Sequence, residues 1–262
     1  MRSFRTEHYV IDVSELPFGD EMPEKIAVVS DLHNTVFGTD NAPVFDVLRK
    51  ESPGLIAIPG DLVTANREEN RIALAFLKEL STLGIPVCYS FGNHEDKFRA
   101  VAPERYREFR KQAEDCGIHI LDNAWFSFSE HVFVGGLTVP SGTYTRGLRV
   151  KKLSKEDIEA CIPEKPDGIR ILLAHNPWYF PSYAEYGADI VISGHVHGGV
   201  IRLPFLGGVI SPQGRLFPKY DAGQFRLGNS ELLVSRGLGD HFIRFSWNNP
   251  YELMIVSFKK GR

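Results

Sequence analysis

Cysteine is scarce in this chain, and that scarcity narrows the possible classes of protein. There are three cysteines, an odd number, and no C-x-x-C spacing, so we expect no disulfide framework and favour a reducing compartment. No apolar run approaches the roughly 18 residues that a membrane-spanning helix needs. Residues 1–10 are charged rather than hydrophobic, unlike a signal peptide. We therefore expect a cytoplasmic protein, with peripheral contact to a membrane left open.

An excess of basic residues is also missing. The 30 Lys and Arg are outnumbered by 33 Asp and Glu, which gives a net charge of −3. A surface for nucleic acid normally needs clustered basic side chains, so no nucleic-acid partner is expected. The chain does have 262 residues, 43% of them hydrophobic, which is enough for a large core. We interpret residues 1–262 as one domain, and its oligomeric state stays open.

Short apolar strands alternate with helical segments in the first half of the sequence. Strands with little alternation, typical of burial on both faces, are expected at residues 25–29, 55–58, 87–90, 169–173 and 188–192. Helices are expected at residues 41–50, 66–83, 103–116, 154–161 and 182–187. Residues 118–137 resemble antiparallel strands, and short β-like runs follow residue 199. This order predicts an α/β fold in which helices lie outside a core of two sheets.

Polar residues follow each of the five buried strands. The last strand leads into S-G-H-V-H-G-G at residues 193–199, where glycines let the backbone turn tightly around His195 and His197. Because ligands bind beyond the carboxyl ends of strands in such sheets, we expect the five strand ends to converge. They would gather seven candidate metal ligands: Asp31, His33, Asp61, Asn93, His175, His195 and His197.

This ligand set contains nitrogen and oxygen but no thiolate. It suits Mn²⁺, Fe, Zn²⁺ or Co²⁺, and we take Mn²⁺ as the first candidate although the ligand set admits all four. Seven side chains exceed what one ion needs but fit two divalent ions about 3.5–4 Å apart, bridged by a carboxylate. Such a pocket stays cationic, attracts an anion and generates a bridging hydroxide as nucleophile. The simplest substrate is a phosphate ester.

His94 is not needed as a ligand. It lies between Asn93 and Glu95 and could reach the substrate from outside the metal pair. We expect His94 to stabilise the transition state and protonate the leaving group, with Glu95 orienting its ring.

Five sequence blocks resemble those of the calcineurin-like metallophosphoesterases, in the same order. They are D-L-H at 31–33, G-D-L at 60–62, G-N-H-E at 92–95, A-H-N-P at 174–177 and G-H-V-H-G-G at 194–199. The resemblance implies a four-layer αββα sandwich with two mixed sheets. It also implies that Asp61 bridges the two metals and that His94 is the catalytic histidine. One metal would then have Asp31, His33, Asp61 and His197 as ligands, and the other Asp61, Asn93, His175 and His195.

Further segments resemble a bacterial subgroup related to membrane-associated phosphoesterases. They are I-R-L-P-F at 201–205, S-R-G-L-G at 235–239 and N-P-Y-E-L-M-I-V at 249–256. Some members of that subgroup cleave phospholipid head groups or the pyrophosphate of a lipid-linked nucleotide sugar. The N-terminal membrane segment that many of them carry is not seen in this sequence. The resemblance implies a phosphate-ester substrate that is a small molecule or lipid-linked.

We therefore predict a binuclear phosphohydrolase that cleaves a phosphodiester or pyrophosphate bond. A phosphomonoesterase and a non-catalytic scaffold are the alternatives. A nuclease would need a basic patch, and the block at residues 60–64 lacks the arginine typical of protein phosphatases. Asn34 and Arg236 could each contact phosphate, but a turn cap and a surface arginine are equally or more consistent with their settings. The apolar residues 178–180 and 203–206 could line a substrate groove or pack in the core.

Overall fold

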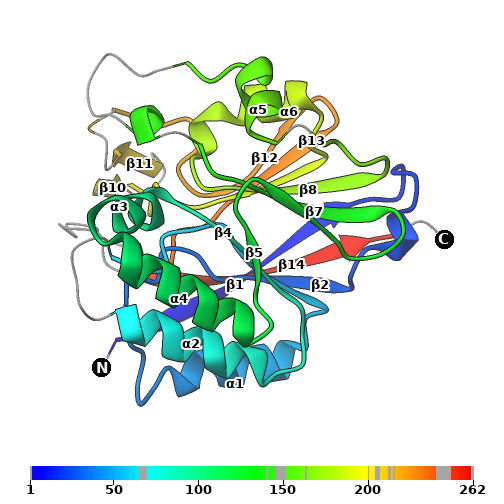
Figure 1. Cartoon of the computed structure of the whole chain (residues 1–262). Helices are drawn as coiled ribbons and strands as arrows, with labels where there is room; N and C mark the ends of the chain where they lie inside the picture. Colours follow the sequence, from blue (N-terminus) through cyan, green and yellow to red (C-terminus); the bar gives the residue numbers. More distant parts are fainter. Residues whose placement is uncertain are drawn as a thin grey trace.

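Two stacked β-sheets form the centre of the computed structural model, with helices on both outer sides (Figure 1). The structure describes residues 2–64, 70–139, 141–144, 152–162, 164–199, 201–203, 207–211, 214, 216–239 and 249–260. Within these residues, the first sheet has the order β1 (Phe4–Asp12), β14 (Tyr251–Lys259), β2 (Lys25–Val28), β3 (Leu55–Ile58), β4 (Val87–Ser90) and β5 (His119–Leu121). The second has the order β12 (Gly223–Leu227), β13 (Ser230–Val234), β9 (Ile190–Ser193), β8 (Ile169–Ala174), β7 (Val132–Leu137) and β6 (Ala124–Ser127).

The helices divide between the two outer faces. The outer side of the first sheet carries four helices: α1 (Ala42–Glu51), α2 (Arg71–Ser81), α3 (Asn93–Val101) and α4 (Pro103–Asp115). The outer side of the second sheet carries α5 (Lys155–Cys161) and α6 (Phe180–Tyr186). Short elements complete the described chain: 3-10 helices η1 (Gly19–Glu21), η3 (Ser141–Tyr144) and η4 (Pro177–Tyr179), and the hairpin strands β10 (Ile201–Leu203) and β11 (Gly207–Ile210).

The central strands are apolar along their whole length because both of their faces are buried. In β2, Ile26 and Val28 join the apolar layer between the sheets, whereas Ala27 points into the layer beneath the helices. A third apolar layer separates the second sheet from α5 and α6. Three apolar layers between four structural layers make an αββα sandwich of two mixed sheets, as predicted.

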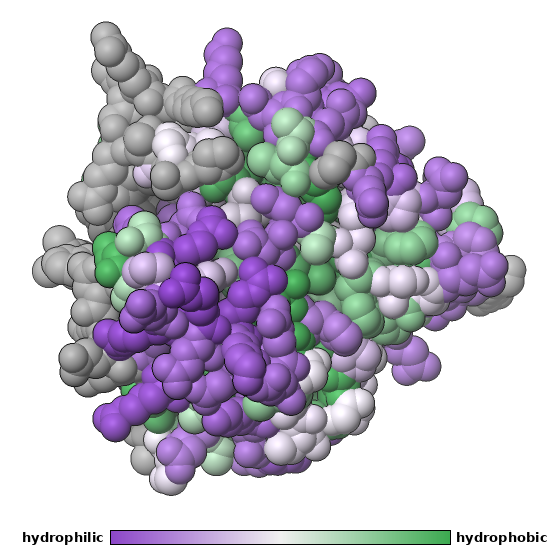
Figure 2. Space-filling view, viewed as in Figure 1, coloured by the Kyte–Doolittle hydropathy of each residue, from purple (hydrophilic) through white to green (hydrophobic). Residues whose placement is uncertain are grey.

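The outer helices owe their placement to amphipathic sequences. In α4, Tyr106, Phe109 and Ala113 are buried against the first sheet, and the remaining positions are mostly charged. Figure 2 shows the resulting hydrophilic surface over α3 and α4. α5 begins with a capping box, since the Ser154 hydroxyl accepts from the Asp157 amide at 3.2 Å and the Ser154 amide donates to the Asp157 carboxylate at 2.9 Å.

Three expectations need correction. Residues 118–137 do not form an antiparallel group: β5 pairs in parallel with β4, and β7 pairs in parallel with β8. Within this stretch only β6 and β7 are antiparallel. The apolar pattern does not report strand direction, and β7 is buried on both faces. The helix expected at 66–83 spans Arg71–Ser81 in the structure, and residues 65–69 lie outside the described chain. Helix α3 was not predicted at all.

Within the part of the chain that the structure describes, every helix is too short or too polar to cross a bilayer.

Candidate metal centre

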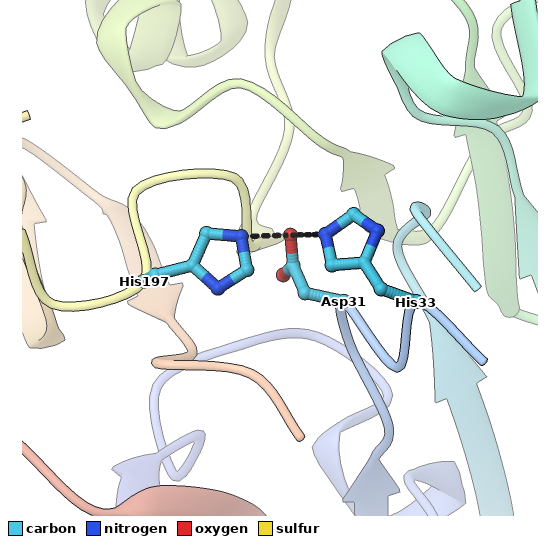
Figure 3. Close-up of side chains that lie close together, drawn as sticks. All are labelled: Asp31, His33 and His197. Carbon is cyan, nitrogen blue, oxygen red and sulfur yellow. Dashed lines mark ion pairs between the residues drawn. The ribbon is translucent and has the colours of Figure 1, made fainter. Parts of the chain in front are cut away.

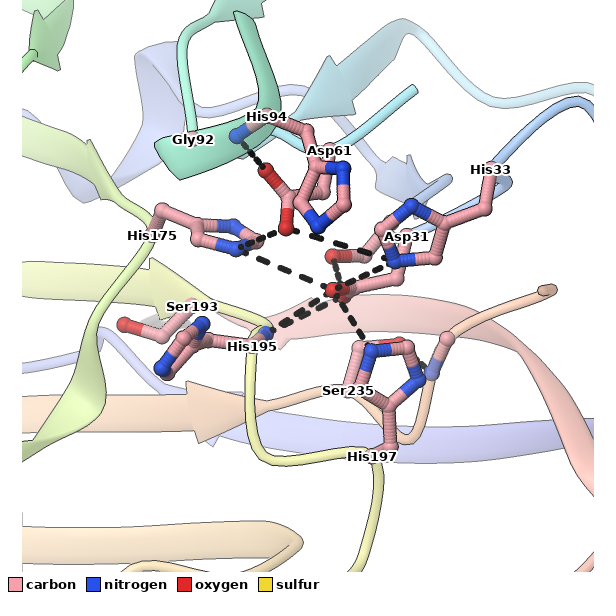
Figure 4. A network of polar contacts seen from close by, with 12 residues as sticks. Asp31, His33, Asp61, Gly92, His94, His175, Ser193, His195, His197 and Ser235 are labelled. Atoms are coloured by element: carbon pink, nitrogen blue, oxygen red, sulfur yellow. Dashed lines mark hydrogen bonds and ion pairs between the residues drawn. The ribbon is translucent and has the colours of Figure 1, made fainter. Parts of the chain in front are cut away.

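Both sheets deliver polar side chains to one shared edge. β2, β3 and β4 are parallel in the first sheet, and β7, β8 and β9 are parallel in the second, so their carboxyl ends lie together. Figure 4 shows the side chains that follow these strands pointing toward one another. The site therefore lies on the seam between the sheets and depends on their stacking.

One group of ligand atoms centres on Asp31. Single ligand atoms of Asp31, His33 and His197 lie within 4.8 Å of one another. The Asp31 Oδ1 atom is 3.2 Å from His197 Nε2 and 3.9 Å from His33 Nε2, so it lies between the two rings (Figure 3). Two imidazoles and a carboxylate in this arrangement can hold a divalent cation.

A second group centres on Asp61. Ligand atoms of Asp61, His175 and His195 also lie within 4.8 Å of one another. The Asp61 Oδ2 atom is 3.0 Å from His175 Nε2 and 4.0 Å from His33 Nε2, so this carboxylate faces histidines of both groups. His94 approaches from a third side, in a set with His33 and Asp61.

The backbone of the site is unusual. Asp31, His33, Asp61, His195 and His197 have φ values of 52°, 47°, 54°, 69° and 52°, in the left-handed region that few non-glycine residues adopt. Strain of this kind persists where surrounding structure enforces it, and it clusters at functional sites. Five such residues around one point indicate that the backbone is bent to turn these side chains inward.

Two glycines let the strand-end loops approach the carboxylates. A Cβ on Gly92 would lie 2.2 Å from Asp61 Oδ1, and one on Gly194 would lie 2.2 Å from Asp31 Oδ2. Neither φ angle is in the left-handed region, so the need for glycine here is one of space. Each carboxylate is thus packed directly against a backbone segment.

Backbone and side-chain donors fix the orientation of the Asp31 carboxylate. The Ser30 hydroxyl donates to it, and the His195 amide donates to Oδ1 at 3.1 Å and Oδ2 at 3.2 Å. Burial raises the pKa of the Asp31 carboxyl; the charge of His175 opposes this rise and that of Asp61 adds to it. A buried acid of this kind needs cationic partners to stay ionised.

Asp61 and His175 behave as an ion pair. Burial alone would raise the pKa of Asp61, yet the neighbouring histidines, led by His175, hold it well below its usual range. Burial opposes charge on His175 as well, but Asp61 and Asp31 together raise its pKa to about 9. A proton on His175 therefore offsets the charge of one carboxylate where a metal would otherwise do so.

Glu95 has a different contact from the one predicted. Its carboxylate accepts from the backbone amides of Asp61, Leu62 and Val63 at 2.9, 2.8 and 3.2 Å. It also accepts from the Gly92 amide at 2.8 Å and the Tyr89 hydroxyl at 2.7 Å. His94 Nδ1 has no hydrogen-bond partner among the described residues. The prediction that Glu95 orients the His94 ring is wrong; Glu95 anchors the loop that carries Asp61.

The donor set fits divalent cations. Asn93 is buried, and its Oδ1 atom accepts no hydrogen bond from any part of the chain that the structure describes. A buried acceptor without a donor is costly, and so are two buried carboxylates that approach the same histidines. Cations at this edge would satisfy the Asn93 oxygen and neutralise Asp31 and Asp61.

Sequence reasoning missed Tyr144. It follows β7, a sixth strand whose carboxyl end reaches this edge, and its ring lies edge-to-face against His195 with centroids 5.0 Å apart. Burial raises the pKa of its hydroxyl, and the charges of Tyr183 and then Asp61 add to that rise. The signal was hidden because the strand at 132–137 was predicted to be antiparallel.

Asn34 and Arg236, which could each have contacted phosphate, both have structural roles in the fold. Asn34 donates to Thr64 Oγ1 at 3.1 Å and Asn70 Oδ1 at 3.0 Å, and accepts from the Ala73 amide at 3.2 Å, so its side chain is committed to the start of α2. Arg236 lies near Glu252 and Glu7, with Nε 3.5 Å from the buried Glu252 carboxylate. It is neither an exposed surface arginine nor directed at the metal ligands.

The apolar segments after the histidine blocks differ from one another. Tyr179 and Phe180 are buried in the layer beneath α5 and α6, so they are core residues. Leu203 is 40% exposed. Residues 204–206 lie outside the described chain, as does His241.

Comparisons with known proteins identify the family of the chain. A family model described as calcineurin-like phosphoesterase matches residues 24–199, about two thirds of the chain. The chain therefore belongs to the calcineurin-like phosphoesterase family, and it is a metallophosphoesterase.

Several bacterial proteins are similar along most of their length. The metallophosphoesterase YkuE of Bacillus subtilis is 27% identical over 260 residues, 97% of this chain and 85% of the relative. A metallophosphoesterase of Aquifex aeolicus is 28% identical over 97% of this chain and 92% of its own. The phosphodiesterase YaeI of Escherichia coli is 27% identical over 83% of this chain and 76% of its own. The solved structure of TT1561 from Thermus thermophilus has the same fold, with a TM-score of 0.54, 13% identity and coverage of 83% of this chain and 91% of that one.

Proposed function

We propose that the chain is a binuclear metal-dependent phosphohydrolase that cleaves a phosphodiester or pyrophosphate bond. The observation that carries the proposal is the division of the ligand atoms into two groups, one around Asp31 and one around Asp61. The Asp61 carboxylate faces histidines of both groups, which suits a bridging role. A donor set of imidazole and oxygen admits Mn²⁺, Fe, Zn²⁺ and Co²⁺, and Mn²⁺ is the first candidate we would test.

The residues of the chain would act by holding charge and geometry. Asp31, His33, Asp61 and His197 would hold one cation, and Asp61, Asn93, His175 and His195 the other. When bound, the two cations supply positive charge that polarises the phosphate ester and lowers the pKa of the water that attacks phosphorus. Asp31 and Asp61 return only two negative charges, so the site keeps a net attraction for an anionic substrate.

His94 would transfer the proton to the leaving group. It is less buried than the ligand histidines, and its ring lies 4.7 Å from that of His33, centroid to centroid. Its backbone amide donates to Asp61 Oδ1 at 2.8 Å, which fixes the start of α3 against the site. His94 can therefore reach a substrate oxygen while the deeper ligands stay in place.

A small or lipid-linked diester or pyrophosphate is the proposed substrate class. One similar protein, YaeI, is named a phosphodiesterase, which supports a diester. The block at 60–64 contains no arginine, which disfavours a phosphoprotein substrate.

The test compares bis-p-nitrophenyl phosphate with p-nitrophenyl phosphate, after chelation and again after Mn²⁺ is added back, with bound metal counted by mass spectrometry. We expect two metals per chain and metal-dependent cleavage that prefers the diester. Preference for the monoester would indicate a phosphomonoesterase instead. Two bound metals without turnover of either ester, or of a nucleotide-sugar pyrophosphate, would favour a non-catalytic scaffold. Full activity with one metal per chain would overturn the binuclear assignment.

A further inference from the structure

A sixth strand end contributes to the edge where the ligands meet. β7 runs parallel to β8, with Leu137 paired to Ala174, so the chain leaves β7 beside the residue that precedes His175. Residues 141–144 then form η3, which lies against α3, the helix that begins at Asn93 and carries His94. Its last residue, Tyr144, is thus placed between the histidines of the second sheet and the helix of the first.

The Tyr144 side chain packs on the ligand histidines. Its ring lies edge-to-face on His195, with centroids 5.0 Å apart, and tilted against His175 at 6.1 Å. The residue before it, Thr143, is fixed by a hydrogen bond, because its carbonyl accepts from the Tyr179 hydroxyl at 3.0 Å. The Tyr144 ring is therefore positioned both by its contacts with the two histidines and by the backbone of Thr143.

The Tyr144 hydroxyl is unsatisfied within the described part of the chain. Its oxygen is buried, and it has no hydrogen-bond partner in the described ranges. A buried polar atom left in this state is costly, and it calls for an explanation, of which a bound ligand is one. A tyrosine hydroxyl is protonated at neutral pH, so it would present a donor to a ligand rich in acceptors.

We propose that the Tyr144 hydroxyl donates a hydrogen bond to a non-bridging oxygen of the phosphoryl group bound at the metal centre. The inference rests on the proposed function, because it takes the occupant of the site to be a phosphate ester. Tyr144 approaches from the second sheet, whereas His94 belongs to the first, so the two serve different oxygens. A fixed donor that meets charge developing on phosphoryl oxygen stabilises the transition state.

The test is Tyr144→Phe, which keeps the ring on His195 and removes only the hydroxyl. We expect kcat/KM to fall about 10- to 100-fold with the metal content unchanged. The dissociation constant of inorganic phosphate, measured by calorimetry on metal-loaded protein, should rise about 10-fold. The melting temperature of the phosphate-free protein should stay level or rise, since the lost hydroxyl had no partner.

Tyr186→Phe is the matched control. The Tyr186 hydroxyl donates to the Ile162 carbonyl at 3.1 Å beneath the second sheet, away from the ligands. Its loss should lower the melting temperature and leave phosphate binding unchanged, which is the reverse of the Tyr144 result.

Two results would overturn the inference. Unchanged phosphate affinity in Tyr144→Phe would show that the hydroxyl does not contact the phosphoryl group. Loss of a metal from that variant would show that Tyr144 supports the ligands instead. The phosphate measurement needs no turnover, so a protein that binds metals and phosphate but cleaves no ester would count against the proposed function alone.

Discussion

The two sheets contribute chemically different halves of the site. The first sheet supplies the candidate oxygen ligands Asp31, Asp61 and Asn93, together with His33. The candidate ligands that the second sheet supplies, His175, His195 and His197, are all imidazoles. The negative charge of the site thus belongs to one half, and most of its nitrogen donors to the other.

The two carboxylates of the first half differ in how they are supported. Asp31 receives backbone donation across the seam, from the amide of His195 in the second sheet. Asp61 receives backbone donation from its own half, from the His94 amide and through the loop that Glu95 anchors, while its carboxylate faces His175 of the second sheet. A divalent cation needs donors from both halves, so metal binding and the stacking of the sheets should stabilise one another.

Removing the charge of Asp61, whose carboxylate faces histidines of both halves, should have the largest effect on activity. Asp61→Asn keeps the shape of the side chain but removes the carboxylate closest to His175. We expect activity to fall by more than about 100-fold, the upper range for losing a residue that only supports a ligand, and both metals to bind more weakly. Metal content and turnover measured on the same preparation check this.

Asp189→Asn provides the control for that exchange. Asp189 lies at the opposite end of the second sheet, where its carboxylate accepts from the Arg170 amide at 2.8 Å. This variant should keep both metals and full activity. Near-normal turnover in metal-replete Asp61→Asn would contradict the bridging role.

The second prediction separates a proton donor from a ligand. His94→Ala should keep both metals and lose about 10²- to 10⁴-fold in rate, as expected for a general acid. His195→Ala should instead lose one metal, because this ring belongs to the Asp61 group. Metal analysis beside kcat distinguishes the two variants. If His94→Ala loses metal as His195→Ala does, His94 is part of the metal-holding structure.

The strand ends could be predicted from sequence because several independent signals agree there. β3 and β4 begin and end at the predicted residues, and β2 differs by one, since runs of buried apolar residues followed by a polar block leave little choice. The order of the blocks then indicates a common edge. Only the assembled structure shows that five ligand residues adopt left-handed backbone, because tertiary contacts enforce it against local preference.

Strand direction was the harder part. The alternating stretch 132–137 belongs to the interior of the second sheet and runs parallel to β8, and its pattern carries no information about its neighbour. For the same reason Tyr144 was not seen as part of the site. Glu95 was misassigned because sequence adjacency to His94 does not place two side chains together; at the start of a helix they diverge.

The third prediction tests the support of the first half. In Glu95→Gln the side chain keeps its shape, but one acceptor oxygen becomes a donor facing backbone amides that also donate. We expect the free energy of unfolding to fall by about 2–3 kcal/mol, and activity to fall about 10- to 100-fold through the Asp61 loop. Denaturant titration and kinetics measure both.

Glu21→Gln is the comparison for Glu95. Glu21 also accepts a backbone amide, that of His131 at 3.0 Å, but it lies outside the site. This variant should lose less stability and no activity. Equal kinetic effects of the two exchanges would show that Glu95 does not act through Asp61.

The smallest effect concerns the protons that compensate the carboxylates when metal is absent. The raised pKa of His175, about 9, means that the ring is protonated at neutral pH, whereas a metal ligand must be neutral. Metal binding at pH 7.5 should therefore release protons, and affinity should increase as the pH rises toward 9.

The folding stability of the metal-free protein should change with pH in the opposite direction. The stability that protonated His175 contributes is complete below pH about 6.5 and is lost as the pH rises through about 9. The raised pKa of Asp31 acts in the same direction, because that carboxyl favours the folded state while it is protonated. Calorimetry of metal binding in two buffers of different ionisation enthalpy counts the protons, and His131→Gln, a histidine paired with Glu21 away from the site, should leave the count unchanged. Binding without proton release at pH 7.5 would mean that the imidazoles of the second sheet are already neutral, and that the charge of the carboxylates is balanced in some other way.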